Sequence, residues 1–153
     1  MDEFAARVNI EVQYASERAI AAVEKAGGVI TTRFFDRTSV AAMVDAEQHF
    51  MKGRVIPRCK LPPTDAVSYY TDPAQRGYLA DMSAIMRARL QLAQKYGYQL
   101  PDVVDGDWLH ATLMCRKDPY QIWFGLEPGW IVSLTDRCIL KPMDAAIKQY
   151  FTG

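Results

Sequence analysis

The stretch from Val8 to Phe35, VNIEVQYASERAIAAVEKAGGVITTRFF, decides the fold of this chain. Val8–Val12 alternates apolar and polar side chains with the period of two that is typical of a half-buried strand. Val29–Phe35 is rich in β-branched and aromatic residues and predicts a second strand. Apolar residues at helical spacing between them predict a helix over Ser16–Ala26. Strand, helix and strand in this order form a βαβ crossover, so we expect two parallel strands with the helix covering one face.

The expected helix has start and stop signals of its own. Ser16 is the expected N-cap, because its hydroxyl can accept a hydrogen bond from a free backbone N–H of the first turn. The side chains expected to face the sheet are Ala19, Ile20, Val23 and Ala26, and those expected to face solvent are Glu17, Arg18, Glu24 and Lys25. Gly27 and Gly28 end the helix. A phosphate-binding glycine loop leads from a strand into a helix, which is the opposite order, so the pair predicts a cap only.

The composition is that of a folded domain without a charge excess. Half of the 153 residues are hydrophobic, and 18 Lys and Arg balance 18 Asp and Glu. A free-standing nucleic-acid binder is usually basic, so we expect any RNA contact to be local. The sequence contains no run of about 20 apolar residues, which predicts no membrane span. The acidic start Met1–Phe4 resembles neither a secretory signal nor a transit peptide.

The sequence offers no motif for catalysis or cofactor binding. Its three cysteines, Cys59, Cys115 and Cys138, stand far apart and suit reduced thiols. His49 and His110 have no partner at metal-ligand spacing, and we expect ordinary surface or hydrogen-bonded core residues. We therefore predict no enzyme, no metal, no cofactor and no small-molecule substrate. Two alternatives stay open: a small cytosolic α/β enzyme with a cysteine nucleophile, and a free-standing protein-interaction module.

The rest of the chain predicts helices, a loop and a hairpin. Apolar spacing and capping residues predict helices over Val40–Met51 (apolar stripe Val40, Met43, Val44, Phe50 and Met51), Asp81–Tyr96 and Trp108–Cys115, and a last helix opened by Pro142 with Ala146, Ile147 and Tyr150 inward. Asp65–Gly77 is expected to be a loop in which Asp72-Pro73 marks a helix start, a signal that Asp118-Pro119 repeats. Trp130–Leu134 and Cys138–Leu140 predict two strands joined as a hairpin around Asp136-Arg137.

The segment Lys52–Lys60 carries the most one-sided charge in the sequence. Its cations are Lys52, Arg54, Arg58 and Lys60, and it contains no acidic residue. Prolines at positions 57, 62 and 63 prevent a long helix and favour an extended backbone. One interpretation is a solvated connector. The other is a strip that presents its cations to successive phosphates of a polyanion, which makes these four residues the candidate RNA-binding site.

Aromatic residues gather in the C-terminal part of the chain. They are Tyr120, Trp123, Phe124 and Trp130, with Trp108 a little earlier. Beside Arg116 and Lys117 they offer a platform on which nucleobases could stack. The interpretation that we favour is a hydrophobic core, because each ring buries a large apolar surface.

Several long strings of the sequence are informative beyond their local structure. They are VNIEVQ, AIAAVEKAGGVITT, LPP followed by YYTD, RGYLAD, ARLQLAQKYGY, RKDPYQIWFGLEPGW and ILKP, in this order. Together they resemble the mitochondrial large-subunit ribosomal protein of the L-fifteen family from Phe4 to the C-terminus. The resemblance implies a non-catalytic structural constituent of the mitochondrial large ribosomal subunit, located in the matrix. Its implied partners are ribosomal RNA and other large-subunit proteins.

The resemblance also implies a domain division. Residues 1–35 resemble the end of the globular domain shared with bacterial relatives, and residues 36–153 resemble the C-terminal extension of the mitochondrial form, packed on it. Family members begin with a Gly-, Arg- and Lys-rich arm that threads into ribosomal RNA. This sequence shows no such arm and no transit peptide, which accounts for its zero net charge. We thus expect an α/β fold: a βαβ unit, then a mostly helical extension with a C-terminal β-hairpin.

Overall fold

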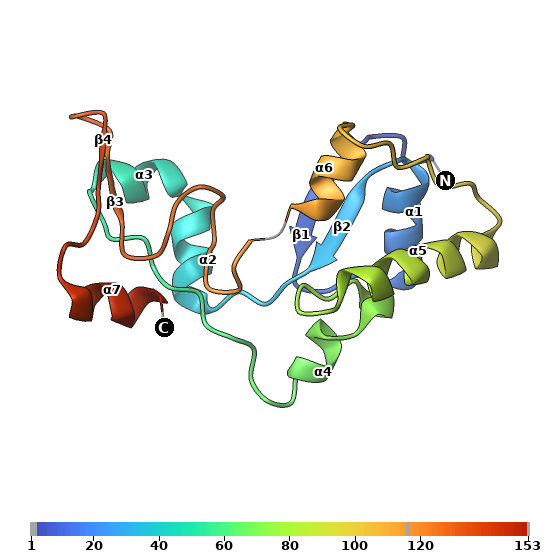
Figure 1. Ribbon diagram of the computed structural model, residues 1–153, viewed down its shortest axis with the longest axis horizontal. Helices are drawn as coiled ribbons and strands as arrows, with labels where there is room; N and C mark the ends of the chain where they lie inside the picture. Colours follow the sequence, from blue (N-terminus) through green and yellow to red (C-terminus); the bar gives the residue numbers. More distant parts are fainter. Residues whose placement is uncertain (1–2, 116, 153) are drawn as a thin grey trace. The chain divides into compact units, whose positions relative to one another are not determined.

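The βαβ crossover is present in the computed structural model, which describes residues 3–115 and 117–152 (Figure 1). Its elements are strand β1 (Asn9–Val12), helix α1 (Glu17–Lys25) and strand β2 (Val29–Thr32). The strands pair in parallel, with Asn9 opposite Val29 and Val12 opposite Thr32. The expected parallel pairing is confirmed, although the second strand ends at Thr32 rather than at Phe35.

Both ends of α1 follow the sequence signals. At its start, Ser16 Oγ accepts a hydrogen bond from the Ala19 N–H at 3.3 Å. At its end, Gly27 has a φ of 85°, and the Gly28 N–H donates to the Val23 carbonyl at 3.0 Å. Gly28 lies so close to the first strand that an added Cβ would approach the Val8 carbonyl oxygen to 2.5 Å. The glycine pair therefore ends the helix and admits the chain to β2 where a side chain would not fit.

The crossover belongs to the first of two compact units, whose described residues are 3–34 and 62–115. Its other elements are α4 (Val67–Tyr70), the 3-10 helix η1 (Pro73–Gln75), α5 (Met82–Tyr96) and α6 (Trp108–Met114). The two longer helices are confirmed, and α5 has Asp81 as its N-cap and a left-handed Gly97 as its C-cap. The loop expected over Asp65–Gly77 is wrong in part, because this segment folds into α4 and η1.

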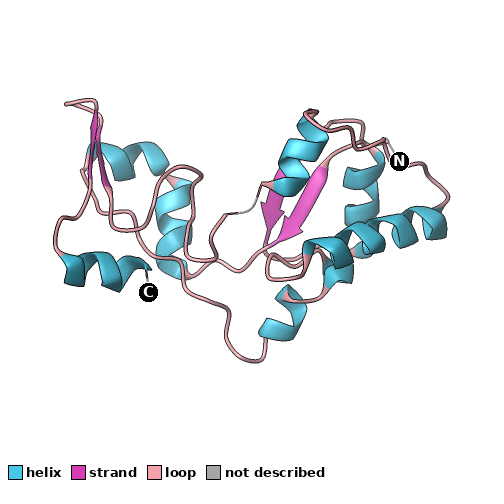
Figure 2. Cartoon of the chain, in the orientation of Figure 1, coloured by secondary structure: helices cyan, strands magenta, loops and turns pink. Residues whose placement is uncertain are grey.

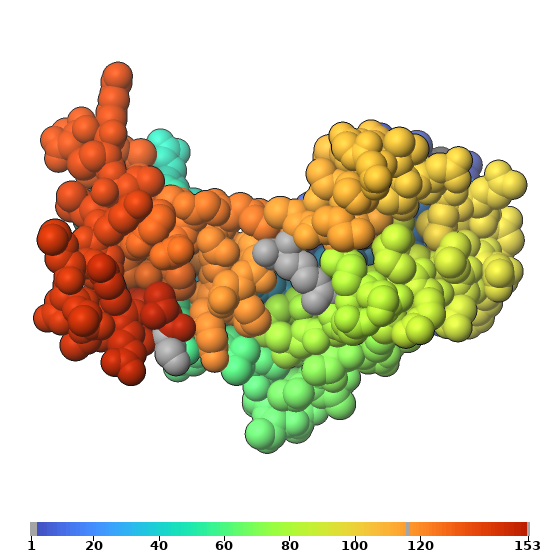
Figure 3. Space-filling model, in the orientation of Figure 1, coloured from blue at the N-terminus to red at the C-terminus, as the bar shows by residue number. Residues whose placement is uncertain are grey.

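Successive residues of β2 face opposite sides of the sheet, and each side is covered. Ile30 packs with Ile20 of α1 and Leu92 of α5 in one buried cluster. Val29 packs with Leu109 of α6 in another. Helices surround the strand pair in Figure 2, and in the space-filling view of Figure 3 the α5 and α6 segments hide most of it. A parallel pair of two short strands leaves water because helices cover both of its faces.

The second unit has residues 35–61 and 117–152 as its described part. Its elements are α2 (Arg37–Val44), α3 (Ala46–Met51), β3 (Ile131–Ser133), β4 (Cys138–Leu140) and α7 (Ala145–Thr152). Strands β3 and β4 pair antiparallel, with Ile131 opposite Leu140. The expected C-terminal hairpin is therefore confirmed.

The single helix expected over Val40–Met51 is wrong. The chain breaks at Asp45, whose φ of −131° and ψ of 66° are not helical. The Asp45 carboxylate accepts a hydrogen bond from the Gln48 N–H at 3.2 Å and begins α3. Because the break separates the two halves of the expected apolar stripe, Val44 and Met51 are 81% and 69% exposed.

Two further expectations for this unit are wrong. Helix α7 leaves Ala146, Ile147 and Tyr150 exposed rather than inward. Asp118-Pro119 starts a turn rather than a helix, in which the Gln121 N–H donates to the Asp118 carbonyl at 2.9 Å. In both places the local signal is present, but the surrounding chain does not use it as the periodicity suggests.

The aromatic residues of the C-terminal part are divided rather than gathered in one core. Trp123 and Trp130 pack, partly buried, against a cluster formed by Phe35, Ala42, Ile56, Cys59 and Ile122. Phe124 is half exposed, and Trp108 lies in the first unit. Arg116, expected beside these rings, lies outside the described residues. The core interpretation therefore fits Trp123 and Trp130 but neither Phe124 nor Trp108.

The fold is α/β with two small sheets and a C-terminal hairpin in the described part of the chain. The two compact units do not follow a single boundary after residue 35, because residues 62–115 pack with the βαβ crossover. The division into a family globular domain and an extension stays a prediction. Within residues 3–115 and 117–152, the helices are too short or too polar to cross a bilayer.

Candidate nucleic-acid interface

The segment 52–60, called here the basic connector, leads away from the C-terminal end of α3 without helix or strand structure. Two of its residues, Ile56 and Cys59, have no exposed surface. The Ile56 N–H donates to the Trp130 carbonyl at 2.9 Å, and the Cys59 N–H donates to the Tyr120 carbonyl at 3.0 Å. The connector is therefore fixed to the second unit by buried residues, and its cations lie on either side of these anchor points and between them.

Three of the four candidate cations face solvent. Lys52, Arg54 and Lys60 are exposed, and among the described residues none of them has an acidic side chain within ion-pair distance. The Lys60 backbone is held in place, because its N–H donates to Asp36 Oδ1 at 3.1 Å. Burial opposes ionisation of Asp36, but the hydrogen bonds from Ser39 and Lys60 outweigh it and keep the pKa of this carboxyl below its usual value.

Arg58 differs from the other three cations. Its guanidinium lies 3.9 Å from the centre of the Tyr120 ring, and its Nη1 donates to the Tyr150 carbonyl at 3.2 Å. Its Nε is buried and has no hydrogen-bond partner among the described residues. A cation that stacks on an aromatic ring and bonds to the backbone is committed to the protein's own packing. The four-residue RNA site stays a prediction, and the geometry favours its other three members.

The net charge of zero hides a difference between the two units. The described part of the second unit carries nine Lys and Arg against seven Asp and Glu. In the first unit the corresponding numbers are eight and ten. The basic connector therefore lies on the unit with the positive balance, which is the arrangement that phosphate binding requires.

His49 departs from the sequence expectation, because it is buried but not fully hydrogen-bonded. Its side chain is 8% exposed, and its Nε2 has no partner among the described residues. The ring packs 5.6 Å from Phe50 and 5.7 Å from Trp123, measured between ring centres. Burial, and then the charge of Arg54, hold the pKa of His49 below its ordinary value of 6.5. His110 is an ordinary surface residue, 3.4 Å from Asp105.

We expect His49 to make the protein less stable as the pH falls below about 7. In the unfolded chain His49 takes up a proton near its ordinary pKa of 6.5, whereas in the folded chain its lowered pKa keeps it neutral. Protonation therefore favours the unfolded state until the pH drops below the folded pKa. Urea unfolding midpoints at about pH 7.5 and about pH 6 measure the loss. The His49→Gln variant should lose less than the parent chain, and equal losses would contradict the assignment.

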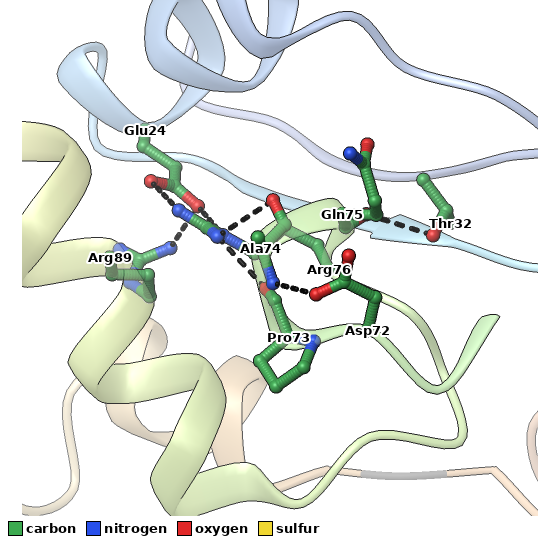
Figure 4. A network of polar contacts seen from close by, with 8 residues as sticks. All are labelled: Glu24, Thr32, Asp72, Pro73, Ala74, Gln75, Arg76 and Arg89. Carbon is green, nitrogen blue, oxygen red and sulfur yellow. Dashed lines mark hydrogen bonds and ion pairs between the residues drawn. The ribbon is translucent and has the colours of Figure 1, made fainter. Parts of the chain in front are cut away.

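The first unit contains a buried ionic network that the sequence does not predict (Figure 4). Glu24 is fully buried, so the expectation that it faces solvent is wrong. Arg76 donates from Nε to Glu24 Oε1 at 2.6 Å and from Nη2 to Oε2 at 3.1 Å, and Arg89 Nη1 lies 3.4 Å from Oε1. The sequence does carry one signal, because Glu24 follows Ile20 by four residues and so lies on the apolar face of α1.

The loop that carries Arg76 is attached to the edge of the sheet. Thr32 Oγ1 donates to the Gln75 carbonyl at 2.9 Å, as Figure 4 shows, and the Tyr78 N–H donates to the Thr32 carbonyl at 2.9 Å. Arg76 itself has a left-handed backbone with a φ of 59°. The network therefore connects α1, the η1 loop and α5, and its role is structural. Within the described part of the chain, no cluster of three or more His, Cys, Asp or Glu is suited to hold a metal.

Comparison with known proteins points in one direction. Residues 2–31 match the family described as ribosomal proteins 50S-L15 and 50S-L18e with their 60S counterpart. The chain is 50% identical to large ribosomal subunit protein uL15m of Danio rerio over 150 residues, which are 98% of this chain and 50% of that protein. It is 34% identical to uL15m of Neurospora crassa over 104 residues, or 54% of this chain and 33% of that protein. For uL15m of Schizosaccharomyces pombe the values are 37% over 79 residues, 51% and 30%. The chain thus spans half the length of the first relative and about a third of the other two.

Proposed function

We infer that this chain belongs to the L-fifteen family in its mitochondrial form and is a structural constituent of the mitochondrial large ribosomal subunit. The observation that carries the proposal is the 50% identity to uL15m of Danio rerio over 98% of the chain. Similarity of this extent includes both compact units and not only the matched family segment. The work of the protein is then mitochondrial translation in the matrix.

The physical role is to hold cationic side chains against ribosomal RNA from a rigid support. The basic connector supplies Lys52, Arg54 and Lys60, which are exposed and lack an acidic partner among the described residues. Phosphate contacts of this kind position a protein on RNA without reading its sequence. Other large-subunit proteins are the expected neighbours of the remaining surface.

The alternative role as a cysteine-dependent enzyme has little to support it. Cys59 is fully buried, and its Sγ lies 3.6 Å from the Lys60 carbonyl oxygen. Cys115 and Cys138 are exposed. An activated thiol would react fast with a thiol reagent near neutral pH, whereas we expect ordinary rates at the exposed pair and slow modification of Cys59.

Cosedimentation with mitochondrial large subunits across a range of salt concentrations tests the proposed function. We expect the Lys52→Ala, Arg54→Ala double variant to bind ribosomal RNA more weakly than the parent chain. Two lost phosphate contacts should flatten the slope of log affinity against log salt by roughly one and a half units. The double variant should keep the fold, because both side chains are exposed.

The matched control is Arg18→Ala with Arg87→Ala, two exposed arginines of the first unit. It removes the same charge from a surface that we do not assign to RNA. If the control loses as much RNA affinity as the connector variant, the connector is not the interface. If the parent chain does not cosediment at any salt concentration, the ribosomal role itself fails.

A further inference from the structure

A groove of about 280 Å³ lies between α2, α3 and the basic connector in the second unit. We call it the α3 groove. Its lining includes Thr38 and Ala41 from α2, Gln48 and His49 from α3, and Lys52 and Arg54 from the connector side. The groove thus joins two of the candidate RNA-binding cations to a hollow that the sequence did not predict.

The lining of the α3 groove has an apolar part and a polar part. Ala41, Val55 and Pro57 provide flat apolar surface. Thr38 and Gln48 provide a hydroxyl and an amide, which can both donate and accept hydrogen bonds. Apolar faces with a few polar groups at the edge are what proteins use to hold an unstacked nucleobase.

The charges at the α3 groove favour an anion at the connector end. Lys52 and Arg54 line it and have no ion-pair partner among the described residues. The opposing carboxylate is that of Asp45, and it already accepts a hydrogen bond from the Gln48 N–H. Two cations against one engaged carboxylate can receive a phosphate group.

His49 supplies an independent observation at the wall of the α3 groove. Its side chain is more than nine-tenths buried, yet Nε2 has no hydrogen-bond partner in the part of the chain that the structure describes. A buried polar atom without a partner costs free energy, and native proteins leave few of them. A ligand with a donor or acceptor at this wall would supply the missing partner.

We propose that the α3 groove binds a single unpaired nucleotide of an RNA strand, with its base on the apolar wall and its phosphate at Lys52 and Arg54. The proposal rests on the proposed function and deepens it, because it names a nucleotide pocket within the RNA contact. An acidic peptide would satisfy the two cations but would leave the apolar wall, the Thr38 hydroxyl and the Gln48 amide without a matched group. RNA supplies all three kinds of contact in one residue.

NMR spectroscopy of the full chain tests the proposal through backbone amide shifts. The probes are the four ribonucleoside 5′-monophosphates, inorganic phosphate, N-acetylaspartate and a short single-stranded RNA. We expect the monophosphates to shift the amides of Thr38, Gln48 and Val55, and inorganic phosphate to shift only those of Lys52 and Arg54. The RNA should bind at least about tenfold more tightly than the monophosphates and weaken with salt, because its other phosphates add contacts.

Three variants separate the parts of the proposed contact. Ala41 is exposed on α2, so Ala41→Leu should fill the groove without disturbing the helix. It should abolish the monophosphate shifts while leaving those of inorganic phosphate. Arg54→Ala should weaken monophosphate binding about tenfold, the loss of one hydrogen bond to a charged group. Arg87→Ala, on an exposed face of α5, should change nothing.

Several results would overturn the proposal. One is a monophosphate titration that moves no amide of the groove, or that moves it equally in Ala41→Leu. Another is N-acetylaspartate shifting the same amides at lower concentration, which would assign an acidic peptide. If the monophosphates bind and the RNA binds no more tightly, the groove is a site for free nucleotides. A chain that cosediments with ribosomal subunits but binds no nucleotide loses this proposal and keeps the ribosomal role.

Discussion

Replacement of Glu24 by alanine should destabilise the protein by about 3–5 kcal/mol, because it leaves two buried guanidinium groups without their carboxylate. Arg76 and Arg89 are 2% and 3% exposed, so water cannot take the place of Glu24. Arg89 already has a pKa lowered by burial, which the charge of Glu24 partly offsets. Urea unfolding of the full chain, followed by far-ultraviolet circular dichroism, measures the loss.

Two further variants make this prediction specific. Glu17→Ala removes a carboxylate from the same helix, 2.7 Å from Lys95 but at the surface, and should change the unfolding midpoint little. Adding Arg89→Met to Glu24→Ala should recover part of the loss, because it removes one of the two uncompensated charges. Equal midpoints for Glu24→Ala and Glu17→Ala would show that the network is open to solvent.

The network also affects a neighbouring tyrosine. Burial, and then the negative charge of Glu24, raise the pKa of Tyr98 to about 12. This side chain is among those that pack against the buried cluster between α1, α5 and the sheet. The ionic groups and the apolar core of the first unit are therefore one packing problem, and a change to the network is felt in both.

The βαβ crossover was predictable because its signals are local. The Ser16 cap, the apolar spacing of α1 and the glycine pair are each read within a few residues, and the crossover then dictates parallel pairing. Gly97 and Asp81 set the ends of α5 in the same way. Such elements need no knowledge of what the rest of the chain does.

The burial of Glu24 was not predictable from polarity alone. A glutamate at a helix surface is usually solvated, and only two arginines from 52 and 65 residues further along make its burial tolerable. The spacing of Glu24 from Ile20 placed it on the apolar face, but nothing local named its partners. Long-range pairing of charges is the information that periodicity lacks.

The candidate RNA site shows the same limit from the other side. Sequence alone grouped four cations of the connector by spacing, and it located the segment correctly as one without helix or strand structure. It did not separate Arg58, whose partners are the Tyr120 ring and the Tyr150 carbonyl. Nor did it find the α3 groove, because α2 and α3 form its walls only after the chain breaks at Asp45.

Replacement of Trp123 by alanine should cost about 3–5 kcal/mol of stability, the loss expected for a large aromatic side chain in a packed core. The indole ring lies 4.9 Å from Phe50 and 5.7 Å from His49, between ring centres, and it packs against the buried cluster of the second unit. A cavity left there would also loosen the wall of the α3 groove that His49 forms. Thermal unfolding of the variant measures the effect.

The matched variant is Phe124→Ala, at the neighbouring position. Phe124 is 51% exposed with Lys117 Nζ 5.0 Å from its ring centre, so its loss should cost about 1 kcal/mol or less. If these aromatic residues formed a base-stacking platform instead, the order would reverse: Trp123→Ala would leave the melting temperature almost unchanged, and both variants would weaken RNA binding. The packing of Trp123 against buried neighbours makes stability, rather than RNA affinity, the property that this ring controls.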